Sequence, residues 1–295
     1  MKLLITGASG LLGSKLAKTG LAKGVDVYAG YNTDSPSCGV PVFFDVSDKN
    51  QVEKAFVLVK PDVVVHAASL TDVDKCELNR ELAWKINVDG AKHVAESSAK
   101  NGCFLVYVST DYVFSGEKGC YKETDQTGPV NYYGLTKLKA EEACLKFAPD
   151  CCIARTSVIY GATPAAGKIN FVLWLINKLK NGENLRIVTD QWTSPTLNTS
   201  LADMLLDVVD QRLNGIFHLC GASRVSRYDL ALKVAEVFGL DAGLIEPVSA
   251  SSFNWPAKRP MDSSLDVSKA QNLLRVKPLA LASALAVLKQ EFESV

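Results

Sequence analysis

A tyrosine and a lysine, Tyr133 and Lys137, have the types and the spacing needed for proton transfer. Residues four apart on a helix lie on the same face. A free phenol has a pKa near 10, which is too high for ready proton exchange at neutral pH. An ammonium about 4 Å away contributes about 4 kcal/mol at an effective dielectric of about 20, enough to lower a pKa by about three units. We therefore expect Lys137 to lower the pKa of Tyr133 and to make it a general acid.

A hydroxyl near the end of a predicted strand, that of Thr110, could hydrogen-bond the same substrate oxygen. Polarising a carbonyl in this way stabilises the transition state electrostatically. Tyrosine–lysine pairs of this spacing also occur by chance on helices, and Tyr132 competes for the role, but Tyr133 alone has the lysine four residues on. We predict that Thr110, Tyr133 and Lys137 are catalytic.

The glycine-rich turn Thr6–Gly13 follows the first apolar run and has the pattern G-x-x-G-x-x-G. Glycines let a backbone approach a pyrophosphate, and the following helix offers unpaired N–H groups. A tight turn without a ligand is the alternative, but a strand before the turn and an apolar-periodic helix after it favour a dinucleotide site. The second run ends in Tyr28–Thr33, without a carboxylate for the ribose 2′-hydroxyl of NAD or a cation for a 2′-phosphate, and Asp34 is expected in the loop beyond. We expect NADP, with NAD as the alternative.

Short apolar runs alternate with segments of helical spacing through residues 1–157, which predicts βαβ units and a parallel sheet in an α/β fold. The predicted strands are Leu3–Thr6, Val25–Ala29, Val42–Phe44, Val63–His66, Leu105–Ser109 and Cys152–Arg155. The predicted helices are Leu12–Leu21, Val52–Val59, about Leu82–Lys100 and about Tyr132–Phe147.

The alternation becomes looser after about Val158. Helices are expected at Asn170–Lys180, Thr199–Leu213, Arg227–Phe238 and Leu279–Phe292, a strand at Gly215–Leu219, and loops near 247–264. We expect residues 1–157, with roughly 196–220, to form the NAD(P)-binding domain. Residues 158–195 and 221–295 would form a smaller substrate-binding lobe.

Length, charge and cysteine content narrow the class of protein. The 295 residues suit about two domains, and 32 basic against 32 acidic residues give a net charge of zero. This balance gives no reason to expect a nucleic-acid or membrane partner. No apolar run approaches the ~18 residues of a membrane span, and no signal peptide is expected. The eight cysteines include no C-x-x-C and the three histidines are scattered, so we expect no metal site, free thiols and a cytoplasmic location.

Several longer motifs resemble the dTDP-4-dehydrorhamnose reductase family of extended short-chain dehydrogenases/reductases. The motifs are Thr6–Gly13, Ser109–Phe114, Pro129–Lys137, Arg155–Ser157, Asp190–Thr196 and Arg259–Asp266. They extend over nearly the whole chain, and the last two are the most specific to the family. The resemblance implies a Rossmann-type doubly wound parallel sheet with a smaller C-terminal α/β substrate-binding lobe.

The resemblance also implies a reaction. An oxidoreductase of this family transfers a hydride from NAD(P)H to C4 of dTDP-4-dehydro-L-rhamnose and gives dTDP-L-rhamnose. Tyr133 would protonate the new hydroxylate, Lys137 would hold the nicotinamide ribose, and Thr110 would bind the carbonyl oxygen. Tyr112 would flank the substrate, and Arg259 would face its diphosphate unless it forms a surface ion pair.

Two sets of binding residues are expected from the motifs and the resemblance together. The cofactor set is Gly7, Ser9, Gly10, Leu11, Leu12, Gly13, Asn32, Asp45, Val46, Ala67, Ala68, Ser69, Asn87, Ser109, Tyr133 and Lys137. The substrate set is Thr71, Thr110, Asp111, Tyr112, Val158, Asn170, Trp192 and Arg259.

Two departures from the family pattern keep alternatives open. Val158 stands where a tryptophan is common, which leaves the sugar undecided, and Asp262 stands where an asparagine is usual. Another NDP-sugar reductase or epimerase would share the fold and the Tyr133–Lys137 pair. A non-catalytic NADP-binding subunit, like the regulatory β subunit of methionine adenosyltransferase, has an aliphatic residue at the Val158 position. Both a monomer and a homodimer are compatible with the sequence.

Overall fold

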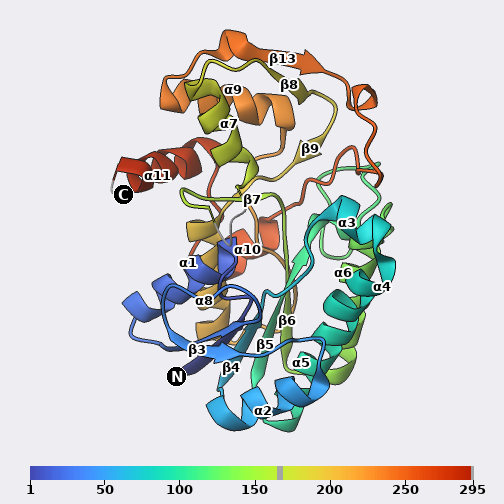
Figure 1. The fold of residues 1–295 in the computed structure, drawn as a ribbon, viewed down its shortest axis with the longest axis vertical. Helices are drawn as coiled ribbons and strands as arrows, with labels where there is room; N and C mark the ends of the chain where they lie inside the picture. Colours follow the sequence, from blue (N-terminus) through green and yellow to red (C-terminus); the bar gives the residue numbers. More distant parts are fainter. Residues whose placement is uncertain (165–168, 294–295) are drawn as a thin grey trace.

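The central element is a parallel sheet of seven strands in the order β11-β6-β5-β4-β1-β2-β3 (Figure 1). The computed structural model describes residues 1–164 and 169–293. The strands are β1 (Lys2–Thr6), β2 (Asp26–Tyr31), β3 (Val40–Phe43), β4 (Val63–His66), β5 (Phe104–Thr110), β6 (Cys151–Thr156) and β11 (Gly215–His218). The predicted α/β fold with a Rossmann-type parallel sheet is confirmed.

Helices cover both faces of this sheet. Helices α1 (Leu11–Ala22) and α8 (Asn198–Gln211) lie on one face, and α2 (Lys49–Val59), α5 (Gly90–Lys100) and α6 (Tyr132–Phe147) lie on the other (Figure 1). Successive strand residues point to opposite faces, so Leu3 and Ile5 enter the core under α1 and α8 while Leu4 enters the core under α2 and α5. This double burial explains why the strands are almost continuously apolar.

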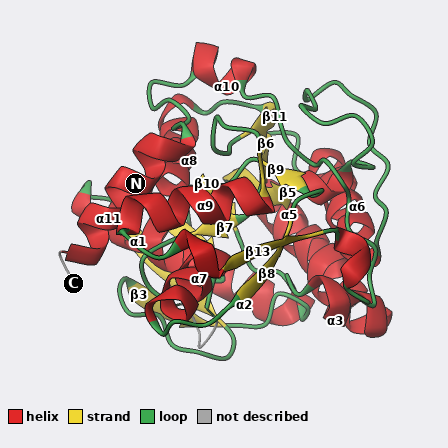
Figure 2. Cartoon of the chain, turned by 90° about the horizontal axis from the view of Figure 1, so that it is seen from above, coloured by secondary structure: helices red, strands yellow, loops and turns green. Residues whose placement is uncertain are grey.

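A second core lies beyond the carboxyl ends of the strands. It is formed by α7 (Phe171–Lys180), α9 (Arg227–Phe238) and α11 (Leu281–Glu293), with the parallel strands β8 (Leu185–Val188) and β13 (Ile245–Val248) beside them (Figure 2). Two further strand pairs form small sheets of their own: β7 (Ile159–Tyr160) with β10 (Thr196–Leu197), and β9 (Trp192–Thr193) with β12 (Val225–Ser226). The division of the chain into a cofactor domain and a substrate lobe stays a prediction.

Several elements differ from those expected. The helix expected over Leu82–Lys100 is divided into α4 (Arg80–Trp84), a π-helical turn (Lys85–Asp89) and α5. Strand β13 extends into the segment that was expected to be a loop. It was not predicted because its sequence, Ile-Glu-Pro-Val, lacks the alternation of a strand. The helices α3 (Val73–Leu78) and α10 (Ser268–Leu273) were also not predicted, since six residues carry too little periodicity. None of the helices in the described residues has the length and apolar character needed to cross a bilayer.

Candidate active site

A cavity of about 720 Å³ opens at the carboxyl ends of β1, β2, β4 and β5. Ligands of open α/β sheets bind at this edge, where the strand order reverses. The opposite wall comes from the second core, through residues that include Asn170, Phe171 and Arg227. The cavity therefore lies between the main sheet and the second core.

The glycine turn forms one end of the cavity. Gly7 has a φ of +68°, and a Cβ at Gly13 would lie 2.2 Å from the carbonyl oxygen of Gly7. Only a glycine at this position lets helix α1 pack so closely against the turn. Helix α1 begins at Leu11 with no side chain capping its first turn and no acidic residue in that turn. The turn thus presents backbone N–H groups and a positive helix end, which fit the pyrophosphate of a dinucleotide.

Buried hydrogen bonds connect the end of β1 with the end of β4, beside the glycine turn. The Thr6 hydroxyl accepts hydrogen bonds from the backbone N–H groups of Ala67 and Ala68, at 3.2 and 3.1 Å. Its own proton is therefore directed to Nδ1 of His66, 2.6 Å away. Burial, with a smaller contribution from the Lys137 charge, lowers the pKa of His66 to about 3. His66 is consequently neutral at physiological pH.

The three predicted catalytic side chains all line the cavity. Tyr133 and Lys137 come from α6, which begins after the Asn131 cap, and Thr110 ends β5. The Lys137 ammonium is almost fully buried and donates a hydrogen bond to the Val108 carbonyl oxygen at 2.7 Å. Burial lowers the pKa of Lys137 to about 8.

The expected lowering of the Tyr133 pKa by Lys137 is wrong for this arrangement. Burial raises the pKa of Tyr133 above that of a free phenol, and a hydrogen bond with Thr110 opposes this effect only in part. The Lys137 ammonium is directed to the Val108 carbonyl and to the Tyr107 ring, whose centroid is 4.2 Å away. Spacing alone could not reveal that desolvation outweighs the charge. Tyr133 is therefore a protonated donor at neutral pH.

Asp111 is the buried anchor of Thr110. Its carboxylate accepts hydrogen bonds from the hydroxyls of Thr110 (3.0 Å), Ser157 (2.8 Å) and Ser263 (2.5 Å). Burial raises the pKa of Asp111, while the three hydroxyls act in the opposite direction. These bonds join the end of β5 to the segment after β6 and to the C-terminal part of the chain.

Comparison with known proteins decides the family. The model of the RmlD substrate binding domain matches residues 1–294. The chain belongs to the dTDP-4-dehydrorhamnose reductase family. The resemblance of the sequence motifs to this family is thereby confirmed.

Individual members of the family match over almost their full length. The probable low-salt glycan biosynthesis reductase Agl14 of Haloferax volcanii is 34% identical over 99% of this chain and 98% of its own. The crystal structure of a Clostridium acetobutylicum dTDP-4-dehydrorhamnose reductase has a TM-score of 0.89 at 34% identity, covering 99% of this chain and 100% of that chain. The Bacillus anthracis enzyme of the same name, solved in complex with NADP, has a TM-score of 0.88 at 30% identity, covering 98% and 99%.

Most residues expected to contact a ligand line the cavity. Of the cofactor set, all but Asn87 do so. Asn87 is buried in the π-helical turn, where it accepts hydrogen bonds from Ser69 and Leu70 and donates to Thr136 and the Leu70 carbonyl. It holds the cavity loop at 69–70 through these contacts. Of the substrate set, Thr71, Thr110, Asp111, Tyr112, Val158 and Asn170 line the cavity.

Two expected substrate residues lie outside this lining. The guanidinium of Arg259 donates to both carboxylate oxygens of Asp74, at 2.9 and 2.8 Å, and to the Ala257 carbonyl. Trp192 packs under Arg224, whose guanidinium carbon is 4.1 Å from a ring centroid of the tryptophan. Arg224 in turn pairs with Asp262, the residue that departs from the family pattern. The negative charge of Asp262 is thus compensated by the ion pair with this arginine.

Among the cavity residues that were given no role in the sequence analysis, two are charged, Arg227 and Asp34. Arg227 begins α9, directly after the Ser226 cap, and faces the cavity. A cation at a predicted helix start was the available signal. Asp34 also lines the cavity and accepts a hydrogen bond from the Thr33 hydroxyl at 3.1 Å. Asp34 lies in the loop after β2, as expected, and the structure shows that this loop brings its carboxylate to the cavity.

A buried ion pair lies behind the catalytic strand end. Glu141 accepts a hydrogen bond from Ser109 at 2.5 Å and pairs with Arg155 at 2.7 Å, and both charged side chains are 3% exposed. Ser109 precedes Thr110, and Glu141 lies one helical turn after Lys137. The pair therefore connects the strand and the helix that carry the catalytic groups.

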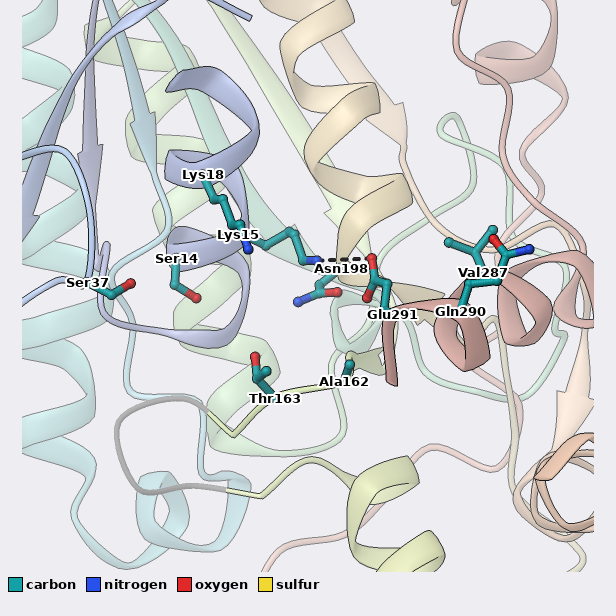
Figure 3. Close-up of a pocket in the computed structure, with 10 residues that line it drawn as sticks. All are labelled: Ser14, Lys15, Lys18, Ser37, Ala162, Thr163, Asn198, Val287, Gln290 and Glu291. Atoms are coloured by element: carbon teal, nitrogen blue, oxygen red, sulfur yellow. Dashed lines mark hydrogen bonds and ion pairs between the residues drawn. The ribbon is translucent and has the colours of Figure 1, made fainter. Parts of the chain in front are cut away.

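A second cavity, of about 480 Å³, lies between α1, the start of α8 and α11 (Figure 3). An ion pair between Lys15 and Glu291, at 3.0 Å, crosses it (Figure 3). Glu291 also accepts a hydrogen bond from Thr199, so the C-terminal helix is tied to both helices of the main sheet. None of the residues expected to contact a ligand lines this cavity. Within the described residues, no group of three or more His, Cys, Asp or Glu side chains could hold a metal ion.

Proposed function

We propose that this chain reduces the 4-keto group of a dTDP-sugar with NADPH. The substrate would be dTDP-4-dehydro-L-rhamnose and the product dTDP-L-rhamnose, in dTDP-rhamnose biosynthesis. The observation that carries the proposal is the meeting of Thr110, Tyr133 and Lys137 in the cavity that the glycine turn closes. Membership of the reductase family supports the same reaction.

The chemistry follows from the side chains. NADPH, when bound, supplies the hydride for the ketone carbon. The Thr110 hydroxyl donates its one proton to Asp111 in this structure. With substrate bound, that O–H would rotate to the ketone oxygen and stabilise its developing negative charge. Tyr133 keeps its proton because its pKa is raised, and it donates that proton to the oxygen as the alcohol forms. Lys137 would hold the ribose hydroxyls next to the nicotinamide.

The cofactor proposal is NADP, with NAD as the alternative. The Bacillus anthracis relative was solved with NADP, which supports the first choice. The Asp34 carboxylate in the loop after β2 favours the second, because a carboxylate beside the ribose accepts hydrogen bonds from its hydroxyls and repels a 2′-phosphate. The ratio of the two coenzymes' kcat/KM values decides between them.

The proposal also covers the cellular location and the oligomeric state of the protein. We propose a cytoplasmic protein without nucleic-acid or membrane partners, acting as a monomer or homodimer. All eight cysteines lie in the described residues and none forms a disulfide there, which supports a reducing compartment. The net charge of zero supports the absence of a polyanionic partner.

Two competing functions predict different results in an assay of coenzyme oxidation. Val158 lines the cavity with an aliphatic side chain, which favours testing other NDP-sugar ketones beside dTDP-4-dehydrorhamnose. A regulatory subunit would bind NADP without turning over any of them. The experiment follows NADPH and NADH oxidation with dTDP-4-dehydrorhamnose and with UDP- and GDP-linked 4-keto sugars. Fast oxidation with the dTDP-sugar supports the proposal, and binding without oxidation, above all with a co-purifying methionine adenosyltransferase, contradicts it.

A further inference from the structure

The cavity has few positive charges for an anionic substrate. Among the described residues that line it, the cations are Lys137 and Arg227, and the carboxylates are Asp34, Asp45 and Asp111. Lys137 donates to the Val108 carbonyl and is assigned above to the ribose of the coenzyme. A sugar nucleotide carries a diphosphate that needs a partner of opposite charge. Arg227 is the cation that remains for it.

Arg227 is held in position without losing its charge to a carboxylate. Ser226 and Asp229 form a reciprocal capping box around the start of α9, and the Arg227 N–H donates to the Gln191 carbonyl oxygen at 3.0 Å. The guanidinium carbon lies 5.1 Å from the Phe171 ring centroid. In the described part of the chain, no ion pair within 4.0 Å involves Arg227. Its planar fork is therefore available to a ligand.

The position of Arg227 relative to the acid suits a sugar nucleotide. The ring of Tyr112 packs edge-on against that of Tyr133, with centroids 6.0 Å apart. The Tyr112 hydroxyl also interacts with the Arg227 guanidinium. Tyr112 thus interacts with both the proton donor and the cation, and all three side chains line the cavity. A sugar with its ketone at Tyr133 would direct its anomeric phosphate toward Arg227.

We propose that Arg227 binds the diphosphate of the nucleotide-sugar substrate, in the role that the sequence suggested for Arg259. The proposal rests on the proposed function, because it takes the substrate to be a nucleoside diphosphate sugar. Arg259 gives both of its terminal nitrogens to Asp74 and lies outside the cavity lining. The coenzyme's pyrophosphate would lie at the other end, on the glycine turn and the start of α1.

The test measures binding and needs no turnover. Calorimetric titrations with dTDP, dTMP and thymidine, in the presence of NADP⁺, would compare wild-type protein with Arg227→Gln and Arg227→Lys. The matched control is Arg186→Gln, which removes an exposed arginine on β8. Loss of a charge-assisted fork should weaken dTDP binding about 10- to 100-fold in Arg227→Gln and less in Arg227→Lys. Thymidine and NADP⁺ affinities should stay unchanged in every variant.

Three outcomes would overturn the proposal. Equal dTDP affinity in wild type and Arg227→Gln would remove Arg227 from the phosphate site, as would a wild-type protein that binds no dTDP. A parallel loss of thymidine and NADP⁺ affinity would assign Arg227 a structural role instead. If dTDP binding depends on Arg227 but no dTDP-sugar ketone is reduced, this proposal stands and the reductase function fails.

Discussion

The Lys137 ammonium donates a hydrogen bond to the Val108 carbonyl oxygen at 2.7 Å. Val108 lies on β5 two residues before Thr110, and Lys137 lies on α6 one turn after Tyr133. This bond therefore connects the helix that carries the proton donor with the strand that carries the second hydrogen-bond donor. The relative position of the two hydroxyls depends on it.

Replacing Lys137 should affect both the coenzyme and the reaction. In Lys137→Met, we expect coenzyme affinity to fall about 10-fold and turnover about 100-fold, because the ammonium no longer holds the ribose or fixes α6 on β5. Fluorescence titration with NADPH and steady-state kinetics measure the two effects. A variant that loses thermal stability alone would show Lys137 to be a structural lysine.

Removing one member of the buried Glu141–Arg155 ion pair should destabilise the folded protein strongly. Arg155→Met leaves the Glu141 carboxylate buried with Ser109 alone, and we expect the free energy of unfolding to fall by about 3–5 kcal/mol. The double variant Glu141→Leu/Arg155→Met removes both charges and should recover part of this loss. Denaturant unfolding of the two variants measures the difference. Equal or greater loss in the double variant would contradict the explanation by an unpaired charge.

His66 should make the protein sensitive to acid. Its pKa is about 3 in the folded chain and 6.5 as a free group, so the unfolded state binds the extra proton between these values. The free energy of unfolding should therefore fall, as pH decreases from about 6.5 toward 3, by about 1.4 kcal/mol per pH unit from this group. His66→Asn keeps an acceptor near Thr6 but does not titrate. Its unfolding free energy should depend less steeply on pH, and identical slopes in both proteins would exclude His66 as the source.

The carboxylate of Asp34 should set the choice of coenzyme. In Asp34→Asn, the repulsion of a 2′-phosphate disappears, and we expect the ratio of NADPH to NADH kcat/KM to rise about 10-fold. Glu117→Gln offers a control, since this exposed carboxylate is not among the cavity residues. An unchanged ratio would place Asp34 outside coenzyme recognition.

The sequence was sufficient where function depends on local spacing. The glycine turn, the Tyr133–Lys137 pair and Thr110 each follow from a short motif on a strand or helix that the apolar pattern predicts. The parallel sheet brings strand ends to one edge, so these separate motifs could be expected at one site.

Other features depend on packing between distant segments. Arg259 was expected at the diphosphate, but its partner Asp74 lies 185 positions earlier in the chain. Burial reversed the expected direction of the Tyr133 pKa, and no spacing rule reports burial. Likewise, the position of Arg227 depends on how the lobe that carries α9 closes over the cavity.

The central claim is that Tyr133 donates a proton to a nucleotide-sugar ketone beside bound NADPH. It is tested most directly by single-turnover oxidation of NADPH with dTDP-4-dehydrorhamnose, in wild-type protein and Tyr133→Phe, after both are saturated with coenzyme. We expect oxidation by the wild type and a rate about 10²- to 10⁴-fold lower in the variant, with equal coenzyme affinity. Equal rates in the two proteins, or no oxidation by either, would contradict the claim.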